Sequence, residues 1–102
     1  MAKVIAMYKK PADVAAFEKR YFSGHVPVAK KLPGLRRYEV STGPVNTPAG
    51  PAPYHLVAVL SFDSMAALQQ ALGSPEGRAT AADAMSFAAA GLDLLIMDTK
   101  DV

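Results

Sequence analysis

The sequence predicts an α+β domain in which helices cover one face of a four-stranded antiparallel sheet. Four segments are rich in apolar and β-branched residues, and segments with helical spacing follow the first and the third of them. The resulting order is β-α-β-β-α-β, the ferredoxin-like arrangement. With 102 residues, 51% of them apolar and 20% charged, the chain is expected to fold as one domain over residues 1–102.

The first strand is expected over residues 3–9 (KVIAMYK), because these residue types favour extended structure. Pro11 and Asp13 then begin a helix. Steps of three and four residues between apolar positions predict that one face of this helix is buried. The positions on that face are Val14, Phe17, Tyr21, His25, Val28 and Leu32.

A break is expected within this helix. Gly24 and Pro27 interrupt the apolar pattern, and proline cannot donate to the helical hydrogen-bond ladder. We therefore expect a kink or short break over 23–27, followed by a second helical piece that stops at Pro33-Gly34.

The second strand is expected over 35–42 and the third over 54–62, the segment with the strongest strand pattern (YHLVAVLSF). Between them, residues 43–53 contain four prolines and two glycines. This composition predicts an irregular loop, longer than a tight hairpin requires. We expect it to project from the sheet and to pack on a partner protomer or over the mouth of a pocket.

The second helical region is expected as two helices. Asp63 or Ser64 caps the first of them. Ser74 and Pro75 begin the second, which is rich in alanine up to about Ala90.

The last strand is expected over 92–98, and like the third strand it is apolar on both faces. In the third strand, for example, Val57 and Val59 point away from the face that carries Leu56 and Leu60. Helices can cover only one face of the sheet, and a wet second face would carry alternating polar residues. A second copy stacked sheet against sheet is the simplest cover, so a homodimer is expected.

The net charge of +2 is unevenly distributed, because nine of the eleven lysines and arginines lie in residues 1–40. A nucleic-acid interface would need a basic stripe with aromatic residues between the charges. Paired bases between apolar positions indicate a solvated amphipathic surface instead, so no nucleic-acid partner is expected, although an anionic ligand is the other reading. The pairs are Lys9-Lys10, Lys19-Arg20, Lys30-Lys31 and Arg36-Arg37.

The chain has no cysteine, which excludes disulfides, thiolate zinc sites and cysteine nucleophiles. Its first apolar run, Val4 to Met7, is too short for a signal sequence. No stretch approaches the roughly 18 apolar residues that a membrane span requires. We therefore expect a cytoplasmic protein with no membrane partner.

His25 is the residue on the inward helix face that changes charge near neutral pH, so it can serve as a general acid, a general base or a hydrogen-bond donor. The alternative is a structural histidine, bonded to a backbone carbonyl freed at the Pro27 break. His55 is expected at a sheet edge or dimer rim, with Glu18 and Asp83 as the nearest carboxylate partners for the histidines. No metal-binding spacing is present, so no metal site is expected.

Aromatic residues distributed over the chain could line a cavity for a flat apolar ligand, or simply form the core. Asp83 interrupts an Ala-rich helix and either faces water or orients a donor in the pocket. No phosphate loop, nucleophile elbow or dinucleotide motif is present, so no cofactor is expected. The candidate ligand-binding residues are Phe17, Tyr21, Tyr38, Phe62, Asp83 and Phe87.

A set of short motifs extends over almost the whole chain. In order they are Tyr21, H-x-P from His25 to Pro27, L-P-G-L at 32–35, Tyr38, S-P-E-G at 74–77, and D-x-x-x-F from Asp83 to Phe87. This set resembles the EthD family, named from a protein associated with ethyl tert-butyl ether degradation. Gly24 departs from the family, which more often has a charged or small helix-forming residue there, and is expected to loosen the helix ahead of His25.

The resemblance implies a dimeric α+β barrel with a pocket between the helices and the sheet of each protomer. Related barrels transform aromatic and polyketide-like compounds without a cofactor. The implied function is binding of a small hydrophobic or aromatic molecule, with cofactor-free proton transfer, cyclisation, decarboxylation or oxygenation if His25 acts as a catalytic acid or base. The alternative is a non-catalytic dimer that binds a ligand or has a purely structural role.

Overall fold

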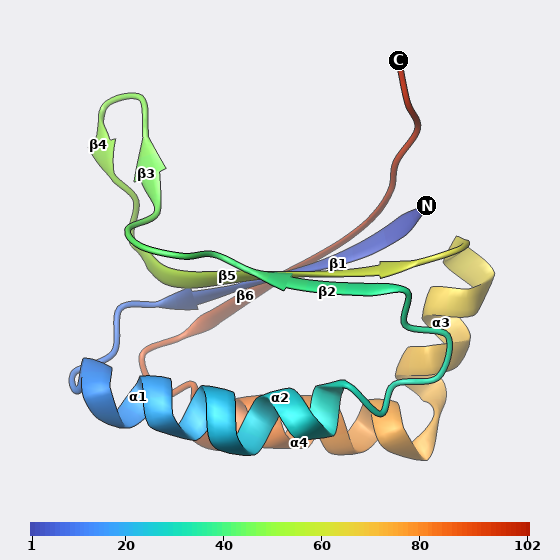
Figure 1. The fold of residues 1–102 in the computed structure, drawn as a ribbon, viewed down its shortest axis with the longest axis horizontal. Helices are drawn as coiled ribbons and strands as arrows, with labels where there is room; N and C mark the ends of the chain where they lie inside the picture. Colours follow the sequence, from blue (N-terminus) through green and yellow to red (C-terminus); the bar gives the residue numbers. More distant parts are fainter.

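A computed structural model describes all of residues 1–102 and confirms the ferredoxin-like fold. Four strands form one antiparallel sheet in the order β2-β5-β1-β6. All helices lie on one side of this sheet (Figure 1). The elements are β1 (Ala2–Lys9), α1 (Val14–Arg20), the π-helical turn η1 (Tyr21–His25), α2 (Val26–Ala29), β2 (Arg37–Val40), β3 (Asn46–Thr47), β4 (Gly50–Pro51), β5 (Tyr54–Phe62), α3 (Met65–Gly73), α4 (Pro75–Phe87) and β6 (Leu92–Asp98).

The core lies between the sheet and the helices. Alternate residues of β1 and β5 point toward the helices and are buried, while Phe17, Tyr21 and Leu68 meet them from the helix side. The inward residues of the two strands are Ala2, Val4, Ala6, Tyr8, Leu56, Ala58, Leu60 and Phe62. No helix is long and apolar enough to span a bilayer.

Of the kink or short break expected over 23–27, the structure has no break but an irregular, π-helical turn at this place. The first helical region continues through η1 into α2, and the N–H of Val26 donates to the carbonyl of Tyr21, five residues earlier. Pro27 is the second residue of α2 and directly follows the widened turn. The helix thus accommodates Gly24 and Pro27 by widening one turn instead of breaking.

The wide turn changes which residues face the core. Phe17, Tyr21, His25 and Ala29 are buried, in three successive steps of four residues. In a regular α-helix each such step overshoots a full turn by about 40°. The extra residue in η1 compensates for that drift, so Ala29 is buried where Val28 was expected. Val14, also expected on this face, is 49% exposed.

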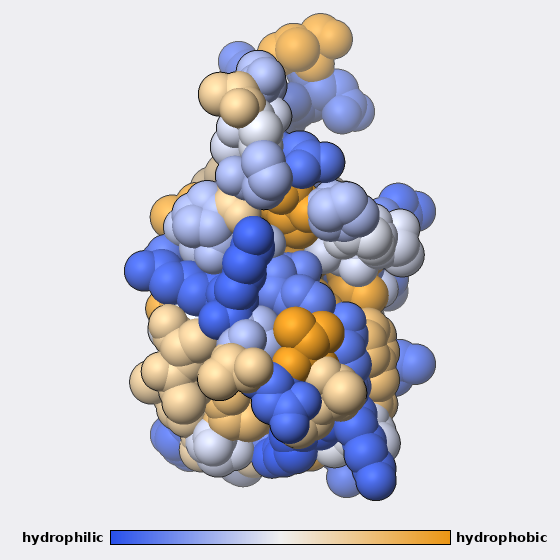
Figure 2. All heavy atoms as spheres, turned by 90° about the vertical axis from the view of Figure 1, so that its left-hand side faces the viewer, coloured by the Kyte–Doolittle hydropathy of each residue, from blue (hydrophilic) through white to orange (hydrophobic).

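Residues 43–53 are more ordered than expected. They contain a short antiparallel hairpin, β3-β4, held by the N–H of Ala52 donating to the carbonyl of Val45 at 2.9 Å. The hairpin projects from the sheet on the side opposite the helices (Figure 1), and in Figure 2 it protrudes at the top of the molecule beside the C-terminal end. The expected projection is therefore present. Helix α4 ends at Phe87 instead of about Ala90.

The second face of the sheet has no helix over it (Figure 1). Its three longest strands carry apolar side chains on this face, and Leu95 and Met97 of β6 are 51% and 43% exposed. We call these residues the outer apolar face. They are Ile5, Met7, Val57, Val59, Leu95 and Met97.

Candidate functional site

A cavity of about 270 Å³ lies between the sheet and the helix layer. Its walls are mainly apolar side chains of β1, β5, β6 and α4. Met85 on α4 and Leu94 and Ile96 on β6 border it and are 68%, 57% and 47% exposed, so the cavity opens between these two elements. Arg78 is also exposed where it borders the cavity.

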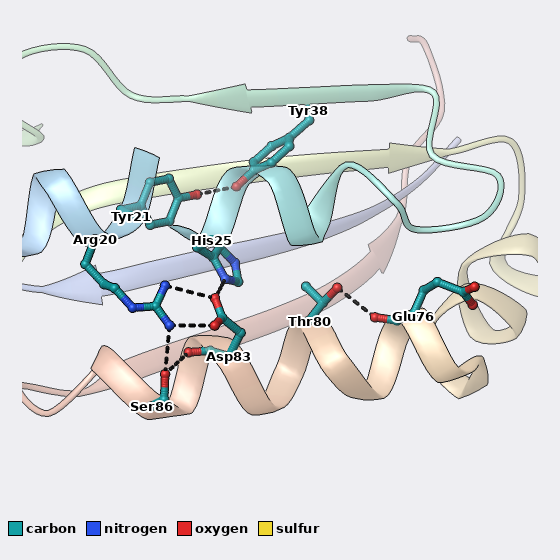
Figure 3. Close-up of polar contacts among 8 residues, drawn as sticks. All are labelled: Arg20, Tyr21, His25, Tyr38, Glu76, Thr80, Asp83 and Ser86. Carbon is teal, nitrogen blue, oxygen red and sulfur yellow. Dashed lines mark hydrogen bonds and ion pairs between the residues drawn. The ribbon is translucent and has the colours of Figure 1, made fainter. Parts of the chain in front are cut away.

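Besides Arg78 and Thr80 of α4, the polar groups of this cavity are one imidazole and three tyrosine hydroxyls. Tyr8 comes from β1, Tyr21 and His25 from η1, and Tyr38 from β2. The hydroxyls of Tyr21 and Tyr38 are 2.6 Å apart and hydrogen-bonded (Figure 3). Only one of the two O–H groups donates within this pair, so the other is left for an acceptor on a ligand.

His25 is held by Asp83 of α4. Its Nδ1 lies 2.8 Å from Asp83 Oδ2, although the two residues are 58 positions apart in the sequence. The ring is only 4% exposed, yet Nε2 has no hydrogen-bond partner. Because no fully buried side-chain nitrogen or oxygen lacks a partner, Nε2 keeps some accessible surface, and the ring borders the cavity. The alternative in which His25 bonds a backbone carbonyl near Pro27 is wrong, because its Nδ1 bonds the carboxylate of Asp83 instead.

Asp83 is itself held by Arg20, from the last turn of α1. Nη2 of Arg20 donates to Oδ1 at 2.5 Å and Nη1 to Oδ2 at 3.3 Å (Figure 3). Asp83 was expected either to face water or to orient a donor. Its side chain is only 20% exposed and orients the donor Nδ1–H of His25. The Lys19-Arg20 pair is not simply solvated, because Arg20 bridges α1 and α4.

The charges follow from this geometry. Hydrogen bonding from Arg20, more than that from His25, lowers the pKa of Asp83 below its usual value, so Asp83 is a carboxylate at neutral pH. Burial lowers the pKa of His25 more strongly than Asp83 raises it, so the ring is neutral near pH 7. An ionised carboxylate can only accept, so Nδ1 carries the ring proton and Nε2 is the acceptor.

The tyrosines remain protonated. Burial is the main reason that the pKa values of Tyr8, Tyr21 and Tyr38 are raised above their usual value. The site therefore combines one neutral proton acceptor with un-ionised hydroxyls in apolar surroundings.

The predicted ligand-binding residues fall into two groups. Tyr21, Tyr38 and Phe62 line the cavity together with His25. Phe17 and Phe87 lie behind it, in an aromatic cluster in which the Phe87 ring is 5.2 Å from the His25 ring. Both border a separate hollow near the end of α4, and Asp83 likewise reaches the cavity only through His25.

His55 lies away from this cavity. Its Nε2 is 3.0 Å from Glu18 Oε1, and its ring packs edge-on against Phe17. Glu18 and Asp83, the two carboxylates named from the sequence, thus each pair with a different histidine. His55 borders another hollow, between α1 and the base of the hairpin. Nowhere in the chain do three or more metal-ligating side chains gather.

Sequence reasoning missed Tyr8 and Arg20. Tyr8 had a detectable signal, because it continues the inward alternation of the first strand from Ala2, Val4 and Ala6. Arg20 had none, because its partner lies 63 residues further along the chain.

Comparison with known proteins places this fold and site in a family. A family profile described as "EthD domain" matches residues 9–91. The chain belongs to the EthD family. The matched segment includes His25, Tyr38 and Asp83 but not Tyr8.

Three relatives show the extent of the likeness. The "Uncharacterized 11.0 kDa protein in thcB-thcC intergenic region" of Rhodococcus erythropolis is 38% identical over 103 residues, covering 100% of this EthD chain and 98% of its own. The crystal structure of an ethyl tert-butyl ether degradation (EthD) family protein from Bacillus halodurans is 39% identical with a TM-score of 0.89, covering 98% and 99% of the two chains. SnoaB of Streptomyces nogalater, described as a cofactor-independent oxygenase, is 14% identical with a TM-score of 0.68 over 99% and 94%, which shows the shared fold alone.

Proposed function

We propose that this EthD domain binds a small, largely apolar molecule in the cavity and that His25 accepts a proton from a hydroxyl of that molecule. The observation that carries the proposal is the place of His25, whose ring borders an apolar cavity and whose acceptor nitrogen, Nε2, has no partner from the chain. A buried polar atom left open to an apolar cavity is a natural point of recognition for a ligand.

The size of the cavity limits the ligand. An apolar cavity of about 150 Å³ holds benzene. At about 270 Å³, this one accommodates a ligand of one or two rings. The apolar walls favour a flat hydrocarbon skeleton, which agrees with the hydrophobic or aromatic ligand expected from the sequence.

The chemistry of the polar end favours a phenolic or enolic hydroxyl. Such a group donates its O–H to Nε2, and in the proton-transfer step that O–H bond breaks while an N–H bond forms at Nε2. The imidazolium is stabilised by Asp83, which already accepts from Nδ1. The resulting oxyanion can accept from a tyrosine hydroxyl, either of the Tyr21–Tyr38 pair or of Tyr8.

Proton removal of this kind needs no cofactor. An oxyanion in conjugation with a ring or double bond is more electron-rich than its parent, which prepares it for cyclisation, decarboxylation or reaction with oxygen. The description of SnoaB as a cofactor-independent oxygenase supports this direction, because the two proteins share a fold.

We further propose that the protein works as a homodimer, joined through the outer apolar face. The exposed side chain of Leu95 lies opposite Ile5 on the neighbouring strand, while the exposed Met97 lies opposite Lys3, at the border of this face. Contiguous exposed apolar surface of this kind marks an interaction surface. A second copy presents the same surface and would cover it symmetrically.

β-Naphthol and naphthalene test the proposed function, because they share two rings and differ by one hydroxyl. The wild-type protein is expected to bind β-naphthol about tenfold more tightly, the value of one hydrogen bond. His25→Leu should bind both compounds equally. His55→Leu is the matched control, because that histidine bonds Glu18 outside the cavity, and it should keep the preference.

Calorimetric titration measures all three proteins, with circular dichroism to verify folding. If folded wild-type protein binds neither compound, the non-catalytic structural reading gains support. If His25→Leu keeps the preference for β-naphthol, the proposed role of His25 is wrong.

A further inference from the structure

The side chain of Arg20 connects two helices. It crosses from α1 to α4 and reaches both oxygens of Asp83, while Nη2 also donates to Ser86 Oγ at 3.2 Å. The guanidinium carbon lies 5.0 Å from the centre of the Phe87 ring. Five-donor guanidinium groups suit this planar, two-point engagement of a carboxylate, whereas a lysine offers only a point charge.

Gly24 makes this path available. A Cβ built on Gly24 would overlap Nη1 of Arg20 and would lie only 3.3 Å from its Cζ. The backbone of Gly24 has no positive φ, so nothing but the side chain of Arg20 requires glycine at this position. Glycine within a helix is otherwise unfavourable relative to alanine.

Asp83 has two neighbours that compete for its charge. Oδ2 meets His25 Nδ1 at 2.8 Å, and Arg20 engages both carboxylate oxygens. A carboxylate paired with a histidine alone would favour the imidazolium, in which Nε2 becomes a donor. With the permanent positive charge of Arg20 on the same carboxylate, the ring can be oriented by Asp83 without being held in its charged form.

We infer that Arg20, seated over Gly24, is a positioning residue for His25: by engaging both oxygens of Asp83, it lets this carboxylate orient the ring while Nε2 stays a proton acceptor. This inference rests on the proposed function only for its purpose, because the geometry exists without a ligand. Arg20 does not line the cavity, and it acts on His25 through Asp83.

The other ionisable groups around His25 do not duplicate this role. Tyr21 of η1, Tyr8 of β1 and Tyr38 of β2 border the same cavity and are un-ionised, with raised pKa values. Arg78 of α4 borders it as an exposed cation without an ion-pair partner. Two charged groups therefore act on the ring. Asp83 bonds it directly, and Arg20 acts through the carboxylate of Asp83.

Two variants test the inference by independent routes. Arg20→Gln removes the charge, and Gly24→Ala leaves the arginine present but blocks its path. In both, the pKa of His25, followed by NMR of the ring in the ligand-free protein, is expected to rise by about one unit. The pH at which β-naphthol binding is half-maximal should move upward with it.

Matched controls separate this effect from a loss of stability. Arg36→Gln removes an exposed Arg36–Asp63 pair at the far end of the sheet and should leave the His25 pKa unchanged. Gly73→Ala adds a Cβ at a helical glycine with open space around it and should likewise have no effect. A merely structural Arg20 would lower the melting temperature without moving the His25 pKa.

The outcomes distinguish the inference from the proposed function. An unchanged His25 pKa in folded Arg20→Gln and folded Gly24→Ala overturns the inference, whatever the ligand does. A raised pKa in both, with no binding of β-naphthol by the wild type, supports the inference and overturns the proposed function. If a variant does not fold, Arg20→Lys serves in its place, with a smaller rise expected because the charge is kept and the two-point engagement is lost.

Discussion

Replacing His25 with leucine separates a functional histidine from a structural one. The change deletes the hydrogen bond between Nδ1 and Asp83 Oδ2 and keeps an apolar side chain of similar size at a position that is 4% exposed. It also removes the acceptor nitrogen from the cavity.

The expected cost in stability is small. A hydrogen bond to a charged group contributes about 2 kcal/mol to the free energy of unfolding. Asp83 is not left unpaired, because Arg20 engages both of its oxygens. Leucine is buried without the desolvation cost of an imidazole, and this difference raises the free energy of unfolding by about 1–2 kcal/mol. The free energy of unfolding is therefore expected to fall by less than about 1 kcal/mol. A change of about 1 kcal/mol lowers the melting temperature of a domain this size by roughly 4–8 °C, so the shift should stay below that.

The assay pairs urea unfolding of the variant with its affinity for β-naphthol. We expect the near-wild-type stability worked out above together with loss of the hydroxyl preference. A variant destabilised by more than about 3 kcal/mol that still prefers β-naphthol would refute the reasoning, because His25 would then be important for packing and unimportant for recognition.

Four further predictions follow from the same structure. Val57→Lys places a charge in the outer apolar face, and sedimentation should show a shift from dimer to monomer, whereas a wild-type protein that is already monomeric contradicts the proposed dimer. Replacing residues 43–53 by a two-residue turn should leave the fold intact but weaken the dimer or alter ligand access; no change in either would make the hairpin a simple connector. Because the pKa of His25 is lowered in the folded protein, the unfolded chain binds this proton more readily, so the free energy of unfolding should fall as pH drops below about 6.5, and His25→Leu should remove that part of the slope in urea titrations. Gly77→Ala would bring a Cβ to within 2.5 Å of the carbonyl oxygen of Leu72 and should destabilise by about 1–3 kcal/mol in thermal unfolding, while unchanged stability would show that α3 and α4 can move apart.

Local chemistry made much of the fold predictable. Short runs of apolar and β-branched residues located β1, β5 and β6, since such residues favour extended structure. The expected caps are also present, because Ser64 and Ser74 accept from the N–H groups three residues later. A cap is formed within one turn of the chain, so a short stretch of sequence is enough to specify it.

The wide turn η1 depended on tertiary packing. Gly24 and Pro27 indicated that the helix is irregular near His25, but a break and a widened turn are compatible with the same residues. The choice follows from burial, because widening keeps Tyr21, His25 and Ala29 on the core side.

Residue patterns alone were enough to place a histidine and several aromatic residues on inward faces of one ferredoxin-like domain. Which of these side chains meet depends on tertiary packing. Arg20 and Asp83 are 63 residues apart, and their contact exists because the helical region that continues from α1 through η1 and α2 packs against α4. Periodicity fixes the face on which a side chain lies, whereas a hydrogen bond of 2.8 Å also requires the distance and rotation between two helices, which depend on how the whole core packs.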